Sequence, residues 1–148
     1  MGKTTPPLLG TLESALYASD LDAAEAFWTG IMGLAVFQKV PGRHVFLRVA
    51  EGPPSQVLLV FDPSATRTPP AADARLPVPP HGAEGQGHYC MAVDPARLDD
   101  WRAHLEAAGV AIEADFRWPN GARSLYVRDP AGNSVEFAEH GLWEPPEP

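Results

Sequence analysis

Hydrophobic and polar residues follow the same order of patterns in the two halves of the chain. In the first half, an alternating segment at residues 11–18 leads into a helical stripe of apolar residues at about 22–32. Three short strands should follow, at 34–40, 44–49 and 56–61. The second half repeats this order, with a strand at 88–93, a helix after Asp94-Pro95, and strands at 110–116, 123–128 and 134–139. Each half is therefore predicted to form a β-α-β-β-β module.

The spacing of matching residues supports a duplication. Glu13 and His88 occupy equivalent places at the starts of the two opening strands, 75 positions apart. Gly33 and Gly109, which we expect to end the two helices, are 76 positions apart. A nearly constant offset across strand, helix and cap is the signature of an internal repeat.

The repeat defines the predicted domain organisation. We expect a single α+β domain over residues 1–148, with one module at 11–62 and the other at 87–140. A proline-rich linker at 63–86 should join them, because it has few large apolar residues. The strands should form a curved, mostly antiparallel sheet around a central trough.

The overall composition excludes several classes of function. The chain has 45% hydrophobic and 20% charged residues, which is typical of a soluble globular protein. A net charge of −8 argues against nucleic acid or an anionic membrane as the main partner. The single cysteine, Cys90, allows no disulfide framework and predicts a reducing, cytoplasmic location. No apolar run approaches the roughly 20 residues of a membrane span.

Three ionisable residues share the face of the predicted strands that points away from the helices. Strand alternation places Glu13 opposite Leu12 and Leu16, and His88 opposite Tyr89, Met91 and Val93. Glu136 likewise lies opposite Val135 and Phe137. If this face curves into a trough, two carboxylates and one imidazole meet there.

Two carboxylates in a shielded trough repel each other, and burying an unpaired charge costs several kcal/mol. A divalent cation between Glu13, His88 and Glu136 removes this conflict. Carboxylate and imidazole ligands suit Zn, Ni, Co, Mn or Fe, and the sequence does not select among them. Three protein ligands leave open positions for water and for a substrate with adjacent oxygens, as Lewis-acid catalysis requires. Gln56 is a possible fourth ligand, whereas His44, His81, His104 and His140 are expected to have structural roles.

The paired modules resemble the vicinal oxygen chelate superfamily, which includes glyoxalase I, extradiol dioxygenases, fosfomycin-resistance transferases and bleomycin-resistance proteins. The resemblance covers residues 11–140. It is carried by Ala18-Ser19-Asp20-Leu21-Asp22-Ala23-Ala24, by Phe27-Trp28, Gly33-Leu34 and Gly87-His88, and by the run from Arg128-Asp129-Pro130 to Val135-Glu136. In this superfamily the metal ligands lie on the first strand of each module and on the final strand. These positions hold Glu13, His88 and Glu136 here.

The resemblance implies a glyoxalase-like enzyme that binds one divalent metal ion. The metal would chelate vicinal oxygens of a small oxygenated metabolite and stabilise an enediolate-like anion, as in a lyase or isomerase. Glu13 or Glu136 would transfer the proton. Substrate contacts are expected from the residues predicted to border the trough: Tyr126, Ser124, Phe61 and Trp118. Because members of the superfamily pair modules between chains, we expect a homodimer in which Glu13 completes a site built by the partner.

The resemblance leaves other functions open. One alternative is a metal-free protein of the bleomycin-resistance type, which would sequester a drug in an aromatic groove. A further alternative is an extradiol-type dioxygenase or a thiol transferase. Glu13 replaces the histidine usual in dioxygenases, so the 2-His-1-carboxylate triad is absent. Ser124 and Tyr126 match antibiotic-contacting hydroxyls of the fosfomycin enzymes, but Ala15 and Phe116 stand where threonine and lysine are expected.

Overall fold

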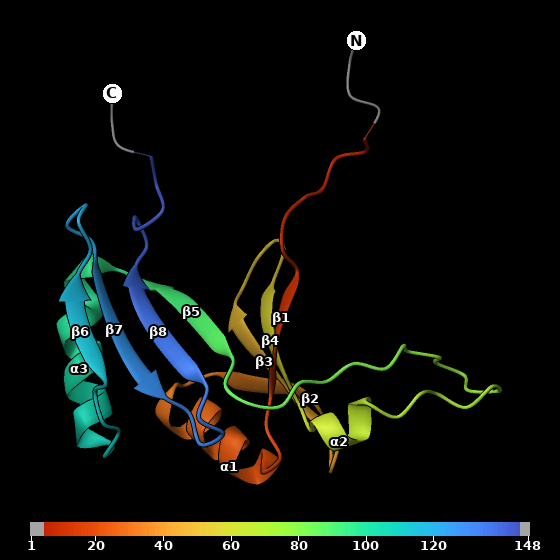
Figure 1. The fold of residues 1–148 in the computed structure, drawn as a ribbon. Helices are drawn as coiled ribbons and strands as arrows, with labels where there is room; N and C mark the ends of the chain where they lie inside the picture. Colours follow the sequence, from red (N-terminus) through yellow and green to blue (C-terminus); the bar gives the residue numbers. More distant parts are fainter. Residues whose placement is uncertain (1–4, 146–148) are drawn as a thin grey trace.

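The computed structural model describes residues 5–145. Its eight strands divide into two open sheets of four, one from each half of the chain (Figure 1). The first half contains β1 (Glu13–Tyr17), α1 (Leu21–Ala26), a π-helical turn η1 (Phe27–Ile31), β2 (Ala35–Val40), β3 (His44–Ala50) and β4 (Gln56–Phe61). The second half contains β5 (His88–Val93), a 3₁₀ turn η2 (Pro95–Arg97), α3 (Leu98–Ala107), β6 (Ala114–Arg117), β7 (Arg123–Arg128) and β8 (Ser134–Glu139). The predicted α+β fold of two β-α-β-β-β modules is thus confirmed.

The two sheets have the same topology. Their strand orders are β1-β4-β3-β2 and β5-β8-β7-β6. In each sheet the first strand of the module pairs in parallel with the last, and the other two pairs are antiparallel. This pairing places His88 beside Ser134 and Cys90 beside Glu136 on the neighbouring strands β5 and β8.

The helix boundaries follow local capping chemistry. Asp20 caps α1, because its carboxylate accepts a hydrogen bond from the amide of Ala23 at 3.0 Å. The end of the helix widens into the π turn η1, in which the amide of Met32 donates to the carbonyl of Phe27. Gly33, with φ of 77°, then ends the helix as predicted.

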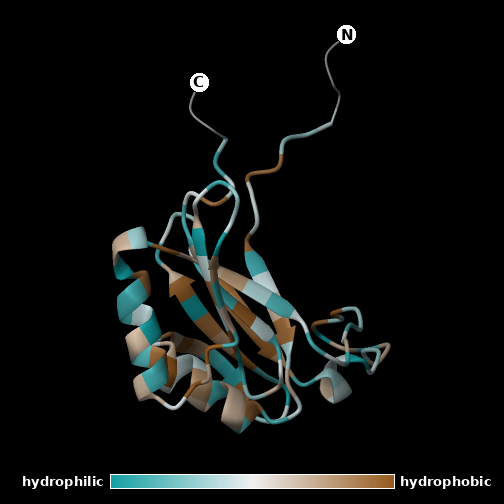
Figure 2. Ribbon diagram, turned by 60° about the vertical axis from the view of Figure 1, so that its left-hand side comes forward, coloured by the Kyte–Doolittle hydropathy of each residue, from teal (hydrophilic) through white to brown (hydrophobic). Residues whose placement is uncertain are grey.

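One hydrophobic core joins the two modules. It lies against the helix-facing side of both sheets, and the fully buried Leu58 and Leu125 are contributed by different sheets. Trp28 of η1 packs edge-on against Tyr89 of β5, with ring centroids 5.9 Å apart. Figure 2 shows the hydrophobic residues concentrated on the strands and on parts of the helices that face them. The helix-facing sides of both sheets therefore pack into one core within a single chain. The opposite faces of the sheets are left without helices.

The segment between the modules leaves the sheets and returns as a long loop (Figure 1). It contains a short helix that the proline pattern did not predict, α2 (Pro63–Thr66), capped by the carboxylate of Asp62. The loop is fastened back at His81, whose amide donates to the carbonyl of Thr66 and whose Nδ1 lies 2.8 Å from the hydroxyl of Tyr17. Within residues 5–145, no helix is long and apolar enough to cross a bilayer.

Candidate functional site

A buried carboxylate lies on the open face of the second sheet. Glu136 is on β8, between Val135 and Phe137, whose side chains are fixed in the core on the other face. Strand alternation therefore turns Glu136 outward, as the sequence predicted, yet its side chain is only 6% exposed. A carboxylate held this far from water needs compensating partners.

His88 supplies one such partner. Its Nε2 lies 3.3 Å from Oε1 of Glu136, while its Nδ1 donates a hydrogen bond to the carbonyl of Ser134 at 3.1 Å. With the Nδ1 proton committed to Ser134, a neutral imidazole directs the lone pair of Nε2 toward the carboxylate. A cation between these two acceptor atoms, either a proton or a metal ion, would stabilise both of them. This local chemistry fits a metal site, with the backbone carbonyl fixing the tautomer of the ligand.

Two hydrogen-bonded side chains, those of Ser124 and Trp118, compensate the other oxygen of Glu136. Ser124 is completely buried, and its Oγ donates to Oε2 of Glu136 at 2.6 Å. The indole Nε1 of Trp118 in turn donates to Oγ of Ser124 at 2.8 Å. These two hydrogen bonds hold one carboxylate oxygen of Glu136 and leave Oε1 directed at His88. The expected substrate contacts of Ser124 and Trp118 stay a prediction.

Aromatic rings line the open face around this pair. Tyr126 lies on β7 opposite Glu136, and its ring is nearly parallel to those of His88 and Phe116, at centroid distances of 6.2 and 5.8 Å. Burial, followed by the Glu136 carboxylate, raises the pKa of Tyr126 to about 12. Its phenol therefore remains a neutral donor at physiological pH.

Cys90 lies between His88 and Ala92 along the same face. Burial and the nearby Glu136 carboxylate raise the pKa of the Cys90 thiol to about 12. The exposed thiol is therefore almost fully protonated at neutral pH, and thiolate chemistry is not expected from it.

The other predicted site residues belong to the first sheet. Glu13 is exposed at the start of β1, and within residues 5–145 no three His, Cys, Asp or Glu side chains are grouped closely enough to hold a metal. The structure thus brings His88 and Glu136 together, without Glu13. Phe61 is buried under Tyr17 and His81 at the far end of the same sheet face. Gln56 is the first residue of β4. Strand alternation places its side chain on the same face as the core residues Leu58 and Val60, whereas Phe61 lies on the other face.

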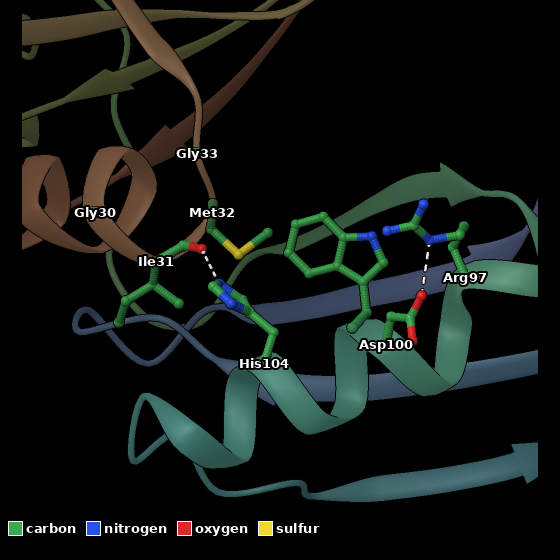
Figure 3. Close-up of a pocket in the computed structure, with 8 residues that line it drawn as sticks. Gly30, Ile31, Met32, Gly33, Arg97, Asp100 and His104 are labelled. Atoms are coloured by element: carbon green, nitrogen blue, oxygen red, sulfur yellow. Dashed lines mark hydrogen bonds and ion pairs between the residues drawn. The ribbon is translucent and has the colours of Figure 1, made fainter.

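A separate cavity of about 440 Å³ lies between η1 and α3, against Trp101 (Figure 3). Its polar groups are already paired. Arg97 forms a 2.8 Å ion pair with Asp100, and His104 Nε2 donates to the carbonyl of Ile31 at 2.7 Å. The cavity thus lies between helices of the two modules. Because its charged groups are paired with each other, none of them indicates a ligand.

Two tandem β-α-β-β-β modules with two open four-stranded sheets are the fold of glyoxalase-like proteins. The sequence profile of the Glyoxalase/Bleomycin resistance protein/Dioxygenase superfamily matches residues 10–137, and the chain belongs to this superfamily. The predicted family is therefore confirmed.

Individual relatives agree with this assignment. The crystal structure of a lactoylglutathione lyase from Agrobacterium tumefaciens shares 47% sequence identity, with a TM-score of 0.84 over 94% of this chain and 99% of that chain. A glyoxalase/bleomycin resistance protein/dioxygenase from Nocardioides has the same fold at 21% identity, with a TM-score of 0.71 over 98% of this chain and 92% of that one. An uncharacterized protein from Pseudomonas aeruginosa is 30% identical over 129 residues, which are 84% of each sequence.

Proposed function

We propose that the protein is a divalent-metal-dependent enzyme of the lyase or isomerase type, acting on a small compound with two neighbouring oxygens. The observation that carries the proposal is the His88–Glu136 pair, in which Nε2 faces Oε1 at 3.3 Å with the Nδ1 proton already committed. The relative from Agrobacterium tumefaciens that is named a lactoylglutathione lyase supports the reaction class. The single Cys90 supports a cytoplasmic location.

We further propose that the site is shared between the subunits of a homodimer. His88 and Glu136 would be contributed by one subunit, and Glu13 by the other. The open sheet faces support this arrangement, because they carry large apolar side chains such as Phe37 and Phe116, which are 45% and 40% exposed. Pairing the first sheet of one chain with the second sheet of another would cover both faces and close the ligand set.

The two carboxylates would then have different roles. A bound divalent ion would supply Lewis-acid polarisation of the substrate oxygens. Ser124 restrains Oε2 of Glu136, so this residue is suited to remain a fixed ligand. Glu13 is exposed on an edge strand, and we assign the proton transfer to it. Tyr126, with its raised pKa, would donate a hydrogen bond from β7, the strand beside Glu136.

Metal analysis and turnover test these roles separately. Protein purified without chelator should contain about one divalent ion per chain, and Glu136→Ala or His88→Ala, which remove the ligand atom, should lose most of it. Glu13→Gln keeps a carbonyl oxygen for the ion but has no proton-accepting carboxylate. We expect this variant to retain metal and to lose activity in an assay with lactoylglutathione as the first substrate. A Glu13→Gln protein with wild-type turnover would refute the assignment.

Mixing inactive variants tests the shared site. In a dimer of Glu13→Ala and Glu136→Ala chains, one site carries both substitutions and the other carries neither. Random exchange should therefore restore about a quarter of the wild-type sites. If all three ligands belonged to one chain, mixing would restore nothing. A wild type that binds no divalent ion but retains aromatic drugs would instead support the sequestering function of the bleomycin-resistance type.

A further inference from the structure

A second polar cavity lies at the end of the β2–β3 hairpin, under the loop that joins the modules. It has a volume of about 420 Å³. Gln38, Arg43 and His44 form its inner wall, while Val40 and the loop residues Leu76 and Val78 provide apolar surface. His44 lies in register with Phe61 across β3 and β4, and Phe61 with Tyr17 across β4 and β1. The cavity is thus about four residues of strand, or roughly 13 Å, from the Glu13 end of the first sheet.

The hydrogen bonds of the inner wall have a fixed direction. Arg43 can only donate, so its Nη1 donates to Nδ1 of His44 at 2.7 Å. The proton of the imidazole must then be on Nε2, which donates to Oε1 of Gln38 at 2.7 Å. Gln38 therefore directs its oxygen at His44, and its two amide N–H groups are left to donate to a ligand. Burial and the positive charge of Arg43 lower the pKa of His44, which keeps the ring neutral and this order of bonds intact.

The charge of Arg43 is not balanced by the protein. Within residues 5–145, no carboxylate lies within ion-pair distance of its guanidinium, and no Asp or Glu lines the cavity. Within the same residues Arg48 and Arg75 also have no ion pair, but neither of them lines a cavity with an apolar wall of this kind. Arg43 is half-buried over the ring of Phe61, so water compensates its charge only in part. The cavity therefore combines a cation and amide donors with an apolar wall.

We propose that this cavity is a binding site for an aliphatic carboxylate, with the carboxylate on Arg43 and Gln38 and the carbon chain against Val40, Leu76 and Val78. Arginine and carboxylate match as a planar donor fork and a planar acceptor pair. A short alkyl chain would cover the exposed loop residues Leu76 and Val78. The site requires neither a metal ion nor Glu13, and it does not depend on the proposed enzymatic function.

Hexanoate is a suitable probe, with hexanol and hexylammonium as ligands of the same chain length and different charge. Binding to metal-free protein would be followed by calorimetry and by the ¹H–¹⁵N signals of the His44 ring. We expect hexanoate to bind at least about tenfold more tightly than either comparator, because one charge-assisted hydrogen bond contributes about that factor. Shifts of the His44 signals should accompany hexanoate binding. Equal affinities for the three probes would overturn the proposal.

Substitution of Arg43 provides a second test of the proposed site. Arg43→Gln should weaken hexanoate binding about tenfold. Arg48→Gln is the matched control, since Arg48 lies on β3, five residues after Arg43, and stacks on Phe37, outside the cavity. It changes the net charge equally and should leave binding unchanged. An equal loss in both variants would show a general charge effect and refute the site. If Arg43→Gln does not fold, the three-ligand comparison on the wild type decides.

Discussion

The hydrogen-bonded pair behind Glu136 offers a direct test of how the candidate metal site is organised. Ser124→Ala removes the Oγ that donates to Oε2 of Glu136 at 2.6 Å and accepts from Trp118 at 2.8 Å. Two consequences oppose each other. The carboxylate becomes more basic, which favours metal binding, but it also becomes free to rotate away from His88. Loss of a partner that orients a metal ligand typically weakens metal affinity about 10- to 100-fold, so we expect the second effect to dominate.

The magnitude follows from burial. Ser124 is fully buried, and the bond it donates is to a charged acceptor, which is worth about 1.5–3 kcal/mol. We therefore predict a loss of at least about tenfold in affinity for Zn²⁺ or Co²⁺, measured by competition with a chelator. Trp118→Phe leaves the serine in place and should cause a smaller loss. Ser14→Ala, on β1 of the other sheet, is the control for a general effect of removing a strand serine.

A comparison of stability and metal affinity in Ser124→Ala can refute the role that we assign to Ser124. Ser124→Ala should also lower the stability of the metal-free protein, because the indole N–H of Trp118 and the Glu136 carboxylate lose a partner. If stability falls while metal affinity remains at the wild-type value, Ser124 is only a packing residue. If affinity rises, basicity rather than orientation controls the site.

Three further predictions concern other parts of the chain. Asp115→Asn should destabilise the fold by about 1–2 kcal/mol near neutral pH, since Arg123 holds the pKa of this carboxyl at about 2. Because the folded-state pKa is below the unfolded one, this stabilisation is present above about pH 4 and is lost as the pH falls toward 2, which acid titrations of wild type and variant would show. Cys90 should react with disulfide reagents at least about tenfold more slowly at pH 8 than an ordinary thiol, because its raised pKa leaves little thiolate, and Glu136→Gln should accelerate it. Leu105→Ala, at a fully buried position of α3, should cost about 2–5 kcal/mol in urea unfolding, and a loss below 1 kcal/mol would contradict the described core.

The fold was predictable because its periodic signals are local and repeated. Strand alternation alone placed Tyr89 in the core and His88 on the open face, and Gly33 ended its helix as expected. The features that the periodic patterns do not predict each depend on a single residue. Asp20 and Asp22 are both plausible caps in sequence, and only the backbone geometry selects Asp20. The π turn of η1 inserts one residue in a way that no 3.6-residue pattern encodes.

The structure brings together two of the three candidate site residues that the sequence indicates, but the sequence does not indicate the residues that support them. His88 and Glu136 could be paired from alternation and the internal repeat, and the structure brings them together. The role of Ser124 depends on which way its hydroxyl points and on the indole of Trp118, which follows β6, and neither is a property of local sequence. The role that we propose for Arg43 was likewise hidden, because it depends on the absence of a carboxylate from residues distant in sequence.

The shared core explains why the proposed active site needs a second chain. Each module has one sheet face covered by helices, and Trp28 packs against Tyr89 on the helix-facing sides of both modules. A chain that uses these sides to join its own modules cannot also turn its two ligand-bearing faces toward each other. Glu13 therefore stays apart from His88 in the single chain, and metal binding and dimerisation must stabilise each other under the proposed arrangement. By mass action, a ligand that binds only the closed pair of sheets shifts the subunit equilibrium toward that pair.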